Sequence, residues 1–401
     1  MSEDRMNNKL RLLYIIVAAV GLVACDGNKT QSNPSMNKSE LNTQDPHLAS
    51  NSSHHIQQKF QIENMAQFDE PWAMSTLPDG KILITERKGK LRIFDPNTKL
   101  LQRVSGIPTV AYGGQGGLGD VAVHPDFAHN RIIYLSYAEQ GQAGNGAVVV
   151  RAELDLSQRK KPQLRKIQRI WEQVPKVSGE GHYAHRIVID EQGKLWISSG
   201  ERQQFDPAQD MKSNLGKIVH LNADGSPSQD NPFYAQGGVA AQIWSLGHRN
   251  PLGLAFDHKK QLWVVEMGPQ GGDELNLVQK GANYGYPYVS NGDHYDGKPI
   301  PDHVTRPEFK APEIHWTPVI SPSSLMIYQA DRLPLWKNKA LISGLSSKAI
   351  IVVDLESQPV QEVQRIDMKN RIRAVEQAKD GSVWVLEDGA GAHLLKLTAQ
   401  S

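Results

Sequence analysis

The chain has 401 residues, of which 39% are hydrophobic, and its formal net charge is +1. A chain of this composition can bury a sizeable core, and its balanced charge excludes the strongly basic surface by which many proteins bind nucleic acid. Cys25 is the only cysteine, so no intrachain disulfide can support the fold.

Residues 1–24 have the pattern of a secretory signal peptide. Lys9 and Arg11 precede an apolar stretch that is too short to be a good membrane span. The stretch ends in Leu-Val-Ala-Cys, which is similar to a bacterial lipobox, where the cysteine becomes the lipidated first residue of the mature chain. We therefore expect export and a lipid anchor at Cys25, on the periplasmic side of the inner or outer membrane. An ordinary signal peptide with an incidental cysteine is the alternative.

The next segment, 25–58, is rich in Asn, Ser, Gln, Thr and Lys and has almost no apolar residues. Such a composition cannot bury enough surface to offset the entropy that ordering removes. It predicts a flexible tether between the anchor and a folded domain that covers 59–401.

From residue 60 onward, a unit of two strands and a turn recurs six times. An alternating apolar strand leads into a turn with Asp or Gly, and an apolar and aromatic strand follows. The units are Trp72–Thr85, Gly119–Tyr137, Ile187–Ser199, Leu252–Glu266, Leu325–Ser343 and Ile372–Glu387. Helix-period segments are scarce, so we expect an all-β fold, a six-bladed β-propeller of four-stranded antiparallel blades. A strand near Phe60–Phe68 should complete the last blade. A β-sandwich or two small barrels is the alternative.

Polar segments stand before or at the start of five of these units, at 113–117, 179–186, 247–251, 316–324 and 371–373. The first strand of each propeller blade lines the central channel, so these segments should meet at one mouth of it. Glycines allow close backbone approach, arginine forks bind carboxylates, and a histidine accepts protons. The sequence therefore predicts a site for a polyanionic ligand with a base beside it.

At these segments the sequence resembles the glucose/sorbosone dehydrogenase family, soluble aldose sugar dehydrogenases that use pyrroloquinoline quinone (PQQ) and calcium. The similarity runs from about residue 60 to the C-terminus, and the family fold is a six-bladed propeller. The motifs are Gly-Gln-Gly-Gly-Leu at 114–118, His-Pro-Asp-Phe at 124–127, Gly-His-Arg-Asn-Pro at 247–251, Gly-Pro-Gln-Gly-Gly-Asp-Glu-Leu-Asn at 268–276, Asn-Tyr-Gly-Tyr-Pro at 283–287 and Arg-Ile-Arg at 371–373.

The resemblance implies roles for the residues that match the family's base and cofactor positions. His182 matches the catalytic histidine, which takes the proton from the anomeric hydroxyl while hydride passes from C1 to the quinone. Arg249, Asn250, Arg371 and Arg373 match residues that hold the cofactor, whose three carboxylates suit the arginine charges.

The resemblance also implies metal sites. Gly268 and Pro269 match positions whose backbone carbonyls bind the calcium that touches the quinone, and a hard cation prefers such oxygen ligands. Glu274 and Tyr284 match ligands of a second, structural calcium. The lysine that some members set against the quinone has no clean counterpart, and Lys348 is the candidate substitute.

On the sugar side, Gln115 matches a glutamine that contacts the substrate, and we expect Trp316 to form a wall of the pocket. His185 stands where the family usually has a small residue. It is either a pocket residue or a structural histidine with its hydrogen bonds satisfied. Gly181 replaces an acidic residue that stands beside the catalytic histidine in some members.

These observations predict a PQQ-dependent enzyme that oxidises an aldose at C1 to the lactone and passes electrons to a membrane quinone or cytochrome. Two other functions stay open. One is a lipid-anchored propeller that binds a carbohydrate or protein with a degenerate site. The other is a calcium-dependent lactonase or hydrolase, which predicts a ring of carboxylates and asparagines in the channel. The oligomeric state is not predicted.

Overall fold

The computed structural model of the protein describes residues 60–158 and 161–400. The predicted signal peptide, the lipidation site Cys25 and the tether over 25–58 lie outside the described residues and stay predictions. Within the described part of the chain, no helix is both long and apolar enough to cross a membrane.

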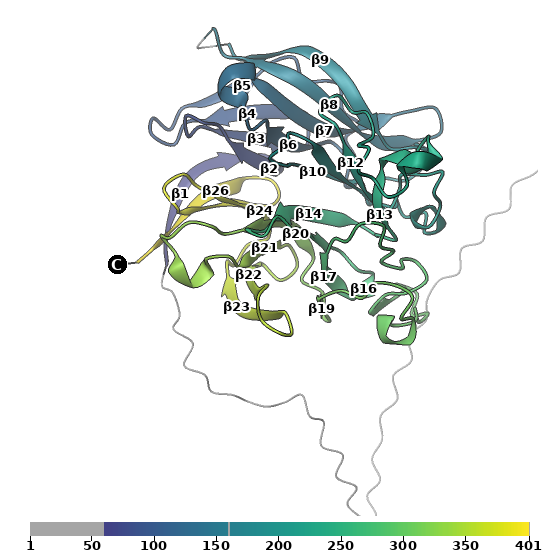
Figure 1. The fold of residues 1–401 in the computed structure, drawn as a ribbon. Coiled ribbons are helices and arrows are strands. Elements are labelled where there is room, and N and C mark those ends of the chain that lie inside the picture. Colours follow the sequence, from purple (N-terminus) through teal and green to yellow (C-terminus); the bar gives the residue numbers. More distant parts are fainter. Residues whose placement is uncertain (1–59, 159–160, 401) are drawn as a thin grey trace, which may run out of the picture. The chain divides into compact units, whose positions relative to one another are not determined.

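Six four-stranded antiparallel sheets follow one another along the chain and form the blades of a propeller (Figure 1). The predicted all-β, six-bladed fold is confirmed. Blade 1 consists of β2 (Pro71–Thr76), β3 (Ile82–Glu86), β4 (Lys90–Phe94) and β5 (Leu101–Val104). Blade 2 consists of β6 (Leu118–Val123), β7 (Ile132–Gln140), β8 (Asn145–Asp155) and β9 (Gln163–Glu172). Blade 3 consists of β10 (Ala184–Ile189), β11 (Leu195–Ser199), β12 (Lys217–Leu221) and β13 (Ile243–Leu246).

Blades 4 to 6 have the same order from the channel outward. Blade 4 consists of β14 (Pro251–Phe256), β15 (Leu262–Glu266), β17 (Asp273–Leu277) and β19 (Ile314–Trp316). Blade 5 consists of β20 (Pro322–Ile327), β21 (Ala340–Gly344), β22 (Ala349–Asp354) and β23 (Gln361–Asp367). Blade 6 consists of β24 (Ile372–Gln377), β25 (Val383–Glu387), β26 (Ala392–Ala399) and β1 (Phe60–Phe68). The short strands β16 (Gln270–Gly271) and β18 (Gly292–Asp293) pair outside the blades. Each predicted two-strand unit is the inner hairpin of one blade.

The ring is closed by pairing between the two ends of the described chain. β1 runs antiparallel to β26, from Phe60 opposite Ala399 to Phe68 opposite Ala392. The innermost strands β2, β6, β10, β14, β20 and β24 contact one another in a closed circle. The prediction that a strand near Phe60–Phe68 completes the last blade is therefore confirmed.

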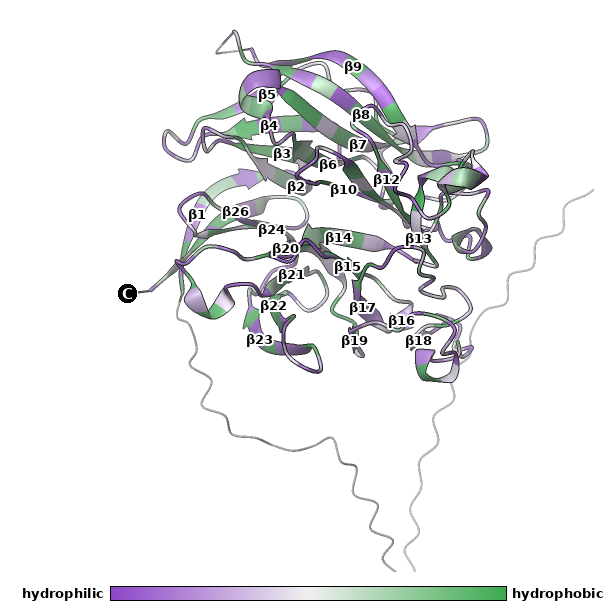
Figure 2. Cartoon of the chain, viewed as in Figure 1, coloured by the Kyte–Doolittle hydropathy of each residue, from purple (hydrophilic) through white to green (hydrophobic). Residues whose placement is uncertain are grey.

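The hydrophobic core lies between neighbouring blades. One cluster joins Leu83 and Ile93 of blade 1 to Ile133 and Val148 of blade 2. Each such buried aliphatic side chain contributes about 1.5–3 kcal/mol to folding. Figure 2 shows hydrophobic residues along inner strands such as β7, and a mainly hydrophilic β9 at the outer edge. The alternation that predicted the strands thus reflects packing of blade on blade.

Every innermost strand is irregular where it starts. In all six blades the pairing with the second strand shifts register within the first few residues, as in a β-bulge. A bulge re-aims side chains that regular alternation would direct elsewhere. The residues at these shifts are Trp72, Gly119, Asp120, His185, Arg186, Leu252, Ser323 and Arg373. They form the floor on which the candidate site is built.

Candidate functional site

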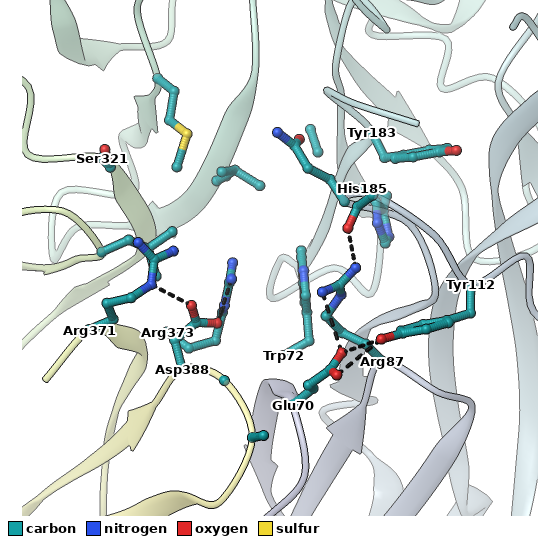
Figure 3. A pocket seen from close by; sticks show the side chains of 18 residues that line it. Glu70, Trp72, Arg87, Tyr112, Tyr183, His185, Ser321, Arg371, Arg373 and Asp388 are labelled. Carbon is teal, nitrogen blue, oxygen red and sulfur yellow. Dashed lines mark hydrogen bonds and ion pairs between the residues drawn. The ribbon is translucent and has the colours of Figure 1, made fainter. Parts of the chain in front are cut away.

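Three adjoining cavities occupy one mouth of the channel, and together they are called the mouth below. The main cavity has a volume of about 480 Å³ and is lined by residues from several blades, among them Gln115, His185, Arg371 and Arg373 (Figure 3). A cavity of about 260 Å³ is lined by His182 and Arg249, and one of about 350 Å³ by Gly268 and Pro269. The cavities share lining residues, so the predicted segments do meet in one place.

His182 lies in the loop that leads into β10 and is 6% exposed. Its Nδ1 forms a short hydrogen bond with Oε1 of Glu201, and the backbone N–H of Phe205 donates to Oε2 of Glu201 at 2.8 Å. An ionised carboxylate can only accept, so Nδ1 carries the proton and Nε2 keeps a free lone pair. The geometry makes His182 a base oriented by a carboxylate.

The charges around this pair favour a neutral imidazole beside an ionised carboxylate. Burial lowers the pKa of His182, Glu201 raises it, and Arg249 lowers it, so that the net shift is downward. Burial opposes ionisation of Glu201, but the hydrogen bonds from His182 and Phe205 outweigh it and lower the carboxyl pKa. At neutral pH, His182 is therefore ready to accept a proton.

Sequence reasoning missed Glu201, although its position follows a rule. It searched the segments before the innermost strands, whereas Glu201 follows β11, the second strand of blade 3. Second strands run antiparallel to the first, so their ends return to the same mouth. Acidic residues end or follow second strands in other blades too, namely Glu86, Glu266, Glu387 and Asp388.

Backbone strain marks both loops of the pair. His182 has a φ of 47° and Phe205 a φ of 64°, in the left-handed region that non-glycine residues avoid. Each such residue costs about 1–3 kcal/mol unless its surroundings hold it. Here the Arg202 N–H donates to the carbonyl of His182 at 3.2 Å, and the Glu201 N–H donates to the carbonyl of Arg249 at 2.9 Å. The two loops therefore fix each other.

Gln115 connects the base to blade 2. Its side-chain Oε1 accepts the backbone N–H of His182 at 2.8 Å, and its own N–H donates to the carbonyl of Glu180 at 2.8 Å. The structure thus places Gln115 in the main cavity next to the base, while its contact with a sugar stays a prediction.

Arg371 and Arg373 converge on a single carboxylate (Figure 3). Asp388 accepts Nε of Arg371 at 2.8 Å, and Nε and Nη2 of Arg373 at 2.8 and 2.6 Å; Nη1 of Arg373 donates to Ser323 Oγ at 3.1 Å. Burial opposes ionisation of Asp388, but the two arginines lower its pKa. One carboxylate balances only one of two guanidinium charges, so this wall of the cavity keeps a positive excess.

Arg249 lines the cavity that contains His182, and both Arg249 and the buried Asn250 next to it have unsatisfied polar atoms. Nη1 of Arg249 donates to the carbonyls of Met267 and Gly268 at 3.0 and 2.7 Å. Within the described residues, Nε of Arg249 and Oδ1 of Asn250 are buried without a hydrogen-bond partner. Buried polar atoms in native proteins are seldom left unpaired, so these two atoms are available for hydrogen bonds to a ligand or to water.

Gly268 and Pro269 form a turn that lines the cavity of about 350 Å³ at the mouth. Asp273 holds it by accepting N–H groups from Gly268 at 2.9 Å and from Ile320 and Ser321 at 2.7 Å, and burial raises the pKa of Asp273 to about 6. The Gly268 carbonyl already accepts one bond from Arg249, but a carbonyl has two lone pairs.

Among the described residues, no three His, Cys, Asp or Glu side chains are grouped to hold a metal. A calcium at the Gly268 turn would therefore need backbone carbonyls and oxygens of a bound ligand.

Glu274 and Tyr284, the predicted second calcium site, do lie together around a cavity of about 10 Å³. Asn276 Nδ2 donates to both Glu274 at 3.1 Å and Glu266 at 3.2 Å. Burial and the neighbouring Glu266 raise the pKa of Glu274 well above its usual value. The Tyr284 carbonyl is 3.1 Å from Nε2 of His303. A cation would relieve the repulsion between the carboxylates, and its presence stays a prediction.

Two predicted residues lie away from the mouth cavities. Trp316 is on β19, the outermost strand of blade 4, where it packs in the apolar core and donates to Glu362 at 2.9 Å. This position does not support the expectation that Trp316 forms a wall of the sugar pocket. Lys348 is exposed just before β22, and its contact with a quinone stays a prediction.

His185 combines the two alternatives that the sequence left open. It lines the main cavity, is 1% exposed, and stacks on Trp72 with ring centroids 5.0 Å apart. Its Nδ1 is 2.7 Å from Ser136 Oγ, which accepts the backbone N–H of Asp120 at 2.7 Å. The Ser136 hydroxyl can then donate its proton to Nδ1, and we expect the tautomer in which Nε2 of His185 carries the ring proton. Burial lowers the His185 pKa to about 3, which keeps the ring neutral.

Arg186, which the sequence placed at the mouth without a role of its own, connects the floor of the mouth to other blades. It donates to Asp120 of blade 2 at 3.0 Å, to the Leu252 carbonyl of blade 4 at 2.8 Å and to the Ser323 carbonyl of blade 5 at 2.8 Å. Its guanidinium also lies 4.2 Å from the ring centroid of Trp72 in blade 1. One buried arginine of blade 3 therefore joins the bulged residues of four other blades.

A family model described as glucose/sorbosone dehydrogenase matches residues 68–396. The chain belongs to this family. The aldose sugar dehydrogenase YliI of Escherichia coli strain K12 is 39% identical over 346 residues, which cover 84% of this chain and 91% of that protein.

Solved structures of the glucose/sorbosone dehydrogenase type agree with this membership. The apo form of the soluble aldose sugar dehydrogenase from Escherichia coli has a TM-score of 0.79 and 37% identity, and the match covers 85% of this chain and all of that one. The PQQ-bound aldose sugar dehydrogenase from Streptomyces coelicolor has a TM-score of 0.69 and 26% identity, covering 86% of this chain and 99% of that one. The family resemblance inferred from the motifs is confirmed, while the roles of single residues remain predictions.

Proposed function

We propose that this protein is a PQQ-dependent dehydrogenase that oxidises an aldose at C1 to the lactone, with calcium at the Gly268 turn. The observation that carries the proposal is the buried His182–Glu201 pair, which lies at the same mouth as a cluster of arginines that one carboxylate only partly neutralises. A base and an anion site in adjoining cavities are what such an oxidation requires.

The residues Arg249, Asn250, Arg371 and Arg373, called the arginine side of the mouth below, fit the cofactor. Arg371, Arg373 and Arg249 would meet the carboxylates of PQQ, and the unpaired Oδ1 of Asn250 and Nε of Arg249 offer it further hydrogen bonds. The carbonyls of Gly268 and Pro269 would hold calcium. When bound, PQQ supplies a quinone that accepts hydride from the sugar.

The histidine side supplies the proton transfer. Nε2 of His182 accepts the proton of the anomeric hydroxyl, and Glu201 stabilises the imidazolium that forms. Burial of the pair excludes water and strengthens this electrostatic stabilisation. The cavity that contains His182 also has the aromatic side chains of Phe205, Tyr286 and Tyr295, which can pack against the apolar face of a sugar ring.

The two other functions have less support. A degenerate binding module should have lost the base or the arginines, yet His182 is paired with a carboxylate and all four cofactor positions are present. A calcium-dependent hydrolase needs a ring of metal ligands in the channel. In the described channel floor, Arg186 occupies the centre with its partner Asp120.

The test is reconstitution of the purified protein with PQQ and calcium, followed by an aldose panel and a redox dye. We expect stoichiometric PQQ uptake and dye reduction with at least one aldose. No uptake, or uptake without dye reduction by any aldose, would contradict the proposal. Hydrolysis of a sugar lactone by the protein with calcium alone would favour the hydrolase.

We also propose that lipidated Cys25 anchors the enzyme on the periplasmic side of the membrane, where a membrane quinone or cytochrome takes the electrons. The support is the signal and lipobox pattern of 1–25. Cys25→Ala should move the protein from the membrane fraction to the soluble periplasmic fraction. A Cys25→Ala protein that stays in the membrane fraction would contradict the anchor.

A further inference from the structure

The loop that carries Gln115 is a glycine-rich turn with one hydrogen bond of its own, from the Gly116 N–H to the Gly113 carbonyl at 2.7 Å. Residues 113–117 contain four glycines, and Gly114 and Gly117 have φ values of 51° and 126°. A Cβ on Gly114 would meet the Glu180 carbonyl oxygen at 2.7 Å, so the close approach requires glycine. Glycine-rich backbone loses more entropy on ordering than other sequences, so outside contacts must hold this loop.

Arg87 supplies those contacts from blade 1. It follows β3, and its Nη2 donates to the carbonyl of Gly114 by a short hydrogen bond and to that of Gly116 at 3.1 Å. A single guanidinium nitrogen, Nη2, thus binds the two carbonyls on either side of Gln115. The Leu118 N–H donates to the carbonyl of Arg87 at 2.8 Å, which anchors the end of the loop independently of the side chain.

Glu70 and Tyr112 hold the guanidinium in turn (Figure 3). Nη1 of Arg87 is 3.5 Å from Oε2 of Glu70, and the Tyr112 hydroxyl donates to the same carboxylate at 2.8 Å. The side chains of Arg87 and Glu70 are 18% and 20% exposed, so the pair is less screened than a surface ion pair.

The contacts continue from the loop to the base. Oε1 of Gln115 accepts the N–H of His182, and the N–H of Gln115 donates to the carbonyl of Glu180, both at 2.8 Å. His182 has a left-handed backbone that needs support. Any shift of the loop therefore moves the hydrogen bond that supports the backbone of the base.

We infer that Arg87 is a positioning residue, which holds the 113–117 loop so that Gln115 supports His182 for proton transfer. The inference rests on the proposed function for its kinetic consequence, but the hold of Arg87 on the loop can be measured without turnover. The two hydrogen bonds to the loop come from Nη2 and the ion pair with Glu70 comes from Nη1. A lysine has the same charge but only one nitrogen, which cannot occupy both positions.

The main test variant is Arg87→Lys, which keeps the positive charge of the cavity. The matched control is Arg103→Lys, the same change on the exposed face of β5 in the same blade. In the reconstituted enzyme, we expect Arg87→Lys to raise KM for the aldose and lower kcat, about 10-fold or more in kcat/KM, since a small misplacement of reacting groups is costly. PQQ affinity and Tm should stay close to the values of Arg103→Lys.

Amide hydrogen exchange of the protein without PQQ gives the readout that is independent of activity. In Arg87→Lys, the Gln115 and His182 amides should exchange at least several-fold faster, whereas the Leu118 amide, bonded to the Arg87 backbone, should not change. Unchanged exchange at Gln115 and His182 would overturn the inference. So would a parallel loss of PQQ affinity and Tm, because it would mean a general structural role. Absence of aldose oxidation in the unmodified protein would contradict the proposed function alone, and the exchange result would still decide the hold of Arg87 on the loop.

Discussion

The His182–Glu201 pair, called the histidine side here, and the arginine side of the mouth differ in how completely their polar groups are paired. Arg202, beside the pair, also has buried Nε and Nη1 atoms without a partner among the described residues, so the difference concerns the pair itself. On the histidine side, the Glu201 carboxylate, the Nδ1 of His182 and the backbone N–H of His182 all have partners within hydrogen-bond distance. On the arginine side, two arginines share one carboxylate, and buried atoms of Arg249 and Asn250 have no partner among the described residues.

This difference separates the part of the site that is formed in advance from the part that needs a ligand. A base must be oriented before the substrate arrives, and strained backbone at His182 and Phe205 shows that the surroundings enforce its position. The positive charge and the unpaired Nε of Arg249 become favourable when an anionic group covers them, whereas the unpaired Oδ1 of Asn250 needs a hydrogen-bond donor. The two sides should therefore respond to mutation in different ways.

The largest expected effect is on the histidine side. His182→Ala removes the proton acceptor, so kcat should fall by about 10²–10⁴-fold, the usual contribution of a general base. PQQ affinity should not change, because the arginine side is untouched. Steady-state kinetics at saturating PQQ, with a calorimetric PQQ titration, measures both. Unchanged turnover would mean that the base is misassigned.

The matching change on the arginine side is Arg373→Met. It removes a largely buried guanidinium with charge-assisted hydrogen bonds, so PQQ should bind about 10–100-fold more weakly. At saturating PQQ, kcat should remain within a few-fold of normal. Arg365→Met, on the outer strand β23 with its Glu362 partner, is the control and should leave PQQ binding unaffected. Equal PQQ affinity in both variants would contradict the proposal that the arginine side binds PQQ.

Glu201→Gln should have a smaller effect with a distinct pH signature. Replacing the carboxylate by a neutral amide should lower kcat by about 10-fold, because a hydrogen bond to a charged group is worth about 1–1.5 kcal/mol more than one to a neutral group. In the unmodified enzyme the pKa of His182 lies below its usual 6.5, so activity should be constant near neutral pH and fall only on acidification. Glu201 raises the pKa of His182, so Glu201→Gln should move the acidic limb of the pH–activity profile, where activity falls, to lower pH. A limb that moves to higher pH would contradict the role of Glu201.

The smallest expected effect concerns His185. Ser136→Ala removes the hydroxyl that supplies a proton to Nδ1, so the ring can take either tautomer. Nitrogen-15 NMR should show the Nε2–H tautomer in the unmodified protein and a mixture in the variant, with kcat changed by less than about 10-fold. A Nδ1–H tautomer in the unmodified protein would contradict the hydrogen-bond direction proposed for Ser136.

The sequence predicted the fold because each blade repeats one hairpin, and the turn residues of that hairpin are visible as Asp and Gly between apolar strands. It also predicted the segments that meet at the mouth, since these precede the innermost strands. Glu201 and Arg87 were missed because they follow second strands, which return to the same mouth without a motif. Trp316 was misleading for a different reason. Thr317, the next residue, does line a mouth cavity, but the Trp316 side chain packs in the apolar core and donates to Glu362. Proximity of the backbone to the mouth thus did not give the direction of the side chain.

Calorimetric titration of PQQ with calcium into the unmodified protein, His182→Ala and Arg373→Met tests the central claim most directly. The account predicts that the unmodified protein and His182→Ala bind PQQ equally well and that Arg373→Met binds it about 10–100-fold more weakly. No binding to the unmodified protein, or an equal loss of affinity in both variants, would contradict the division of the mouth into a preformed base and a ligand-dependent anion site.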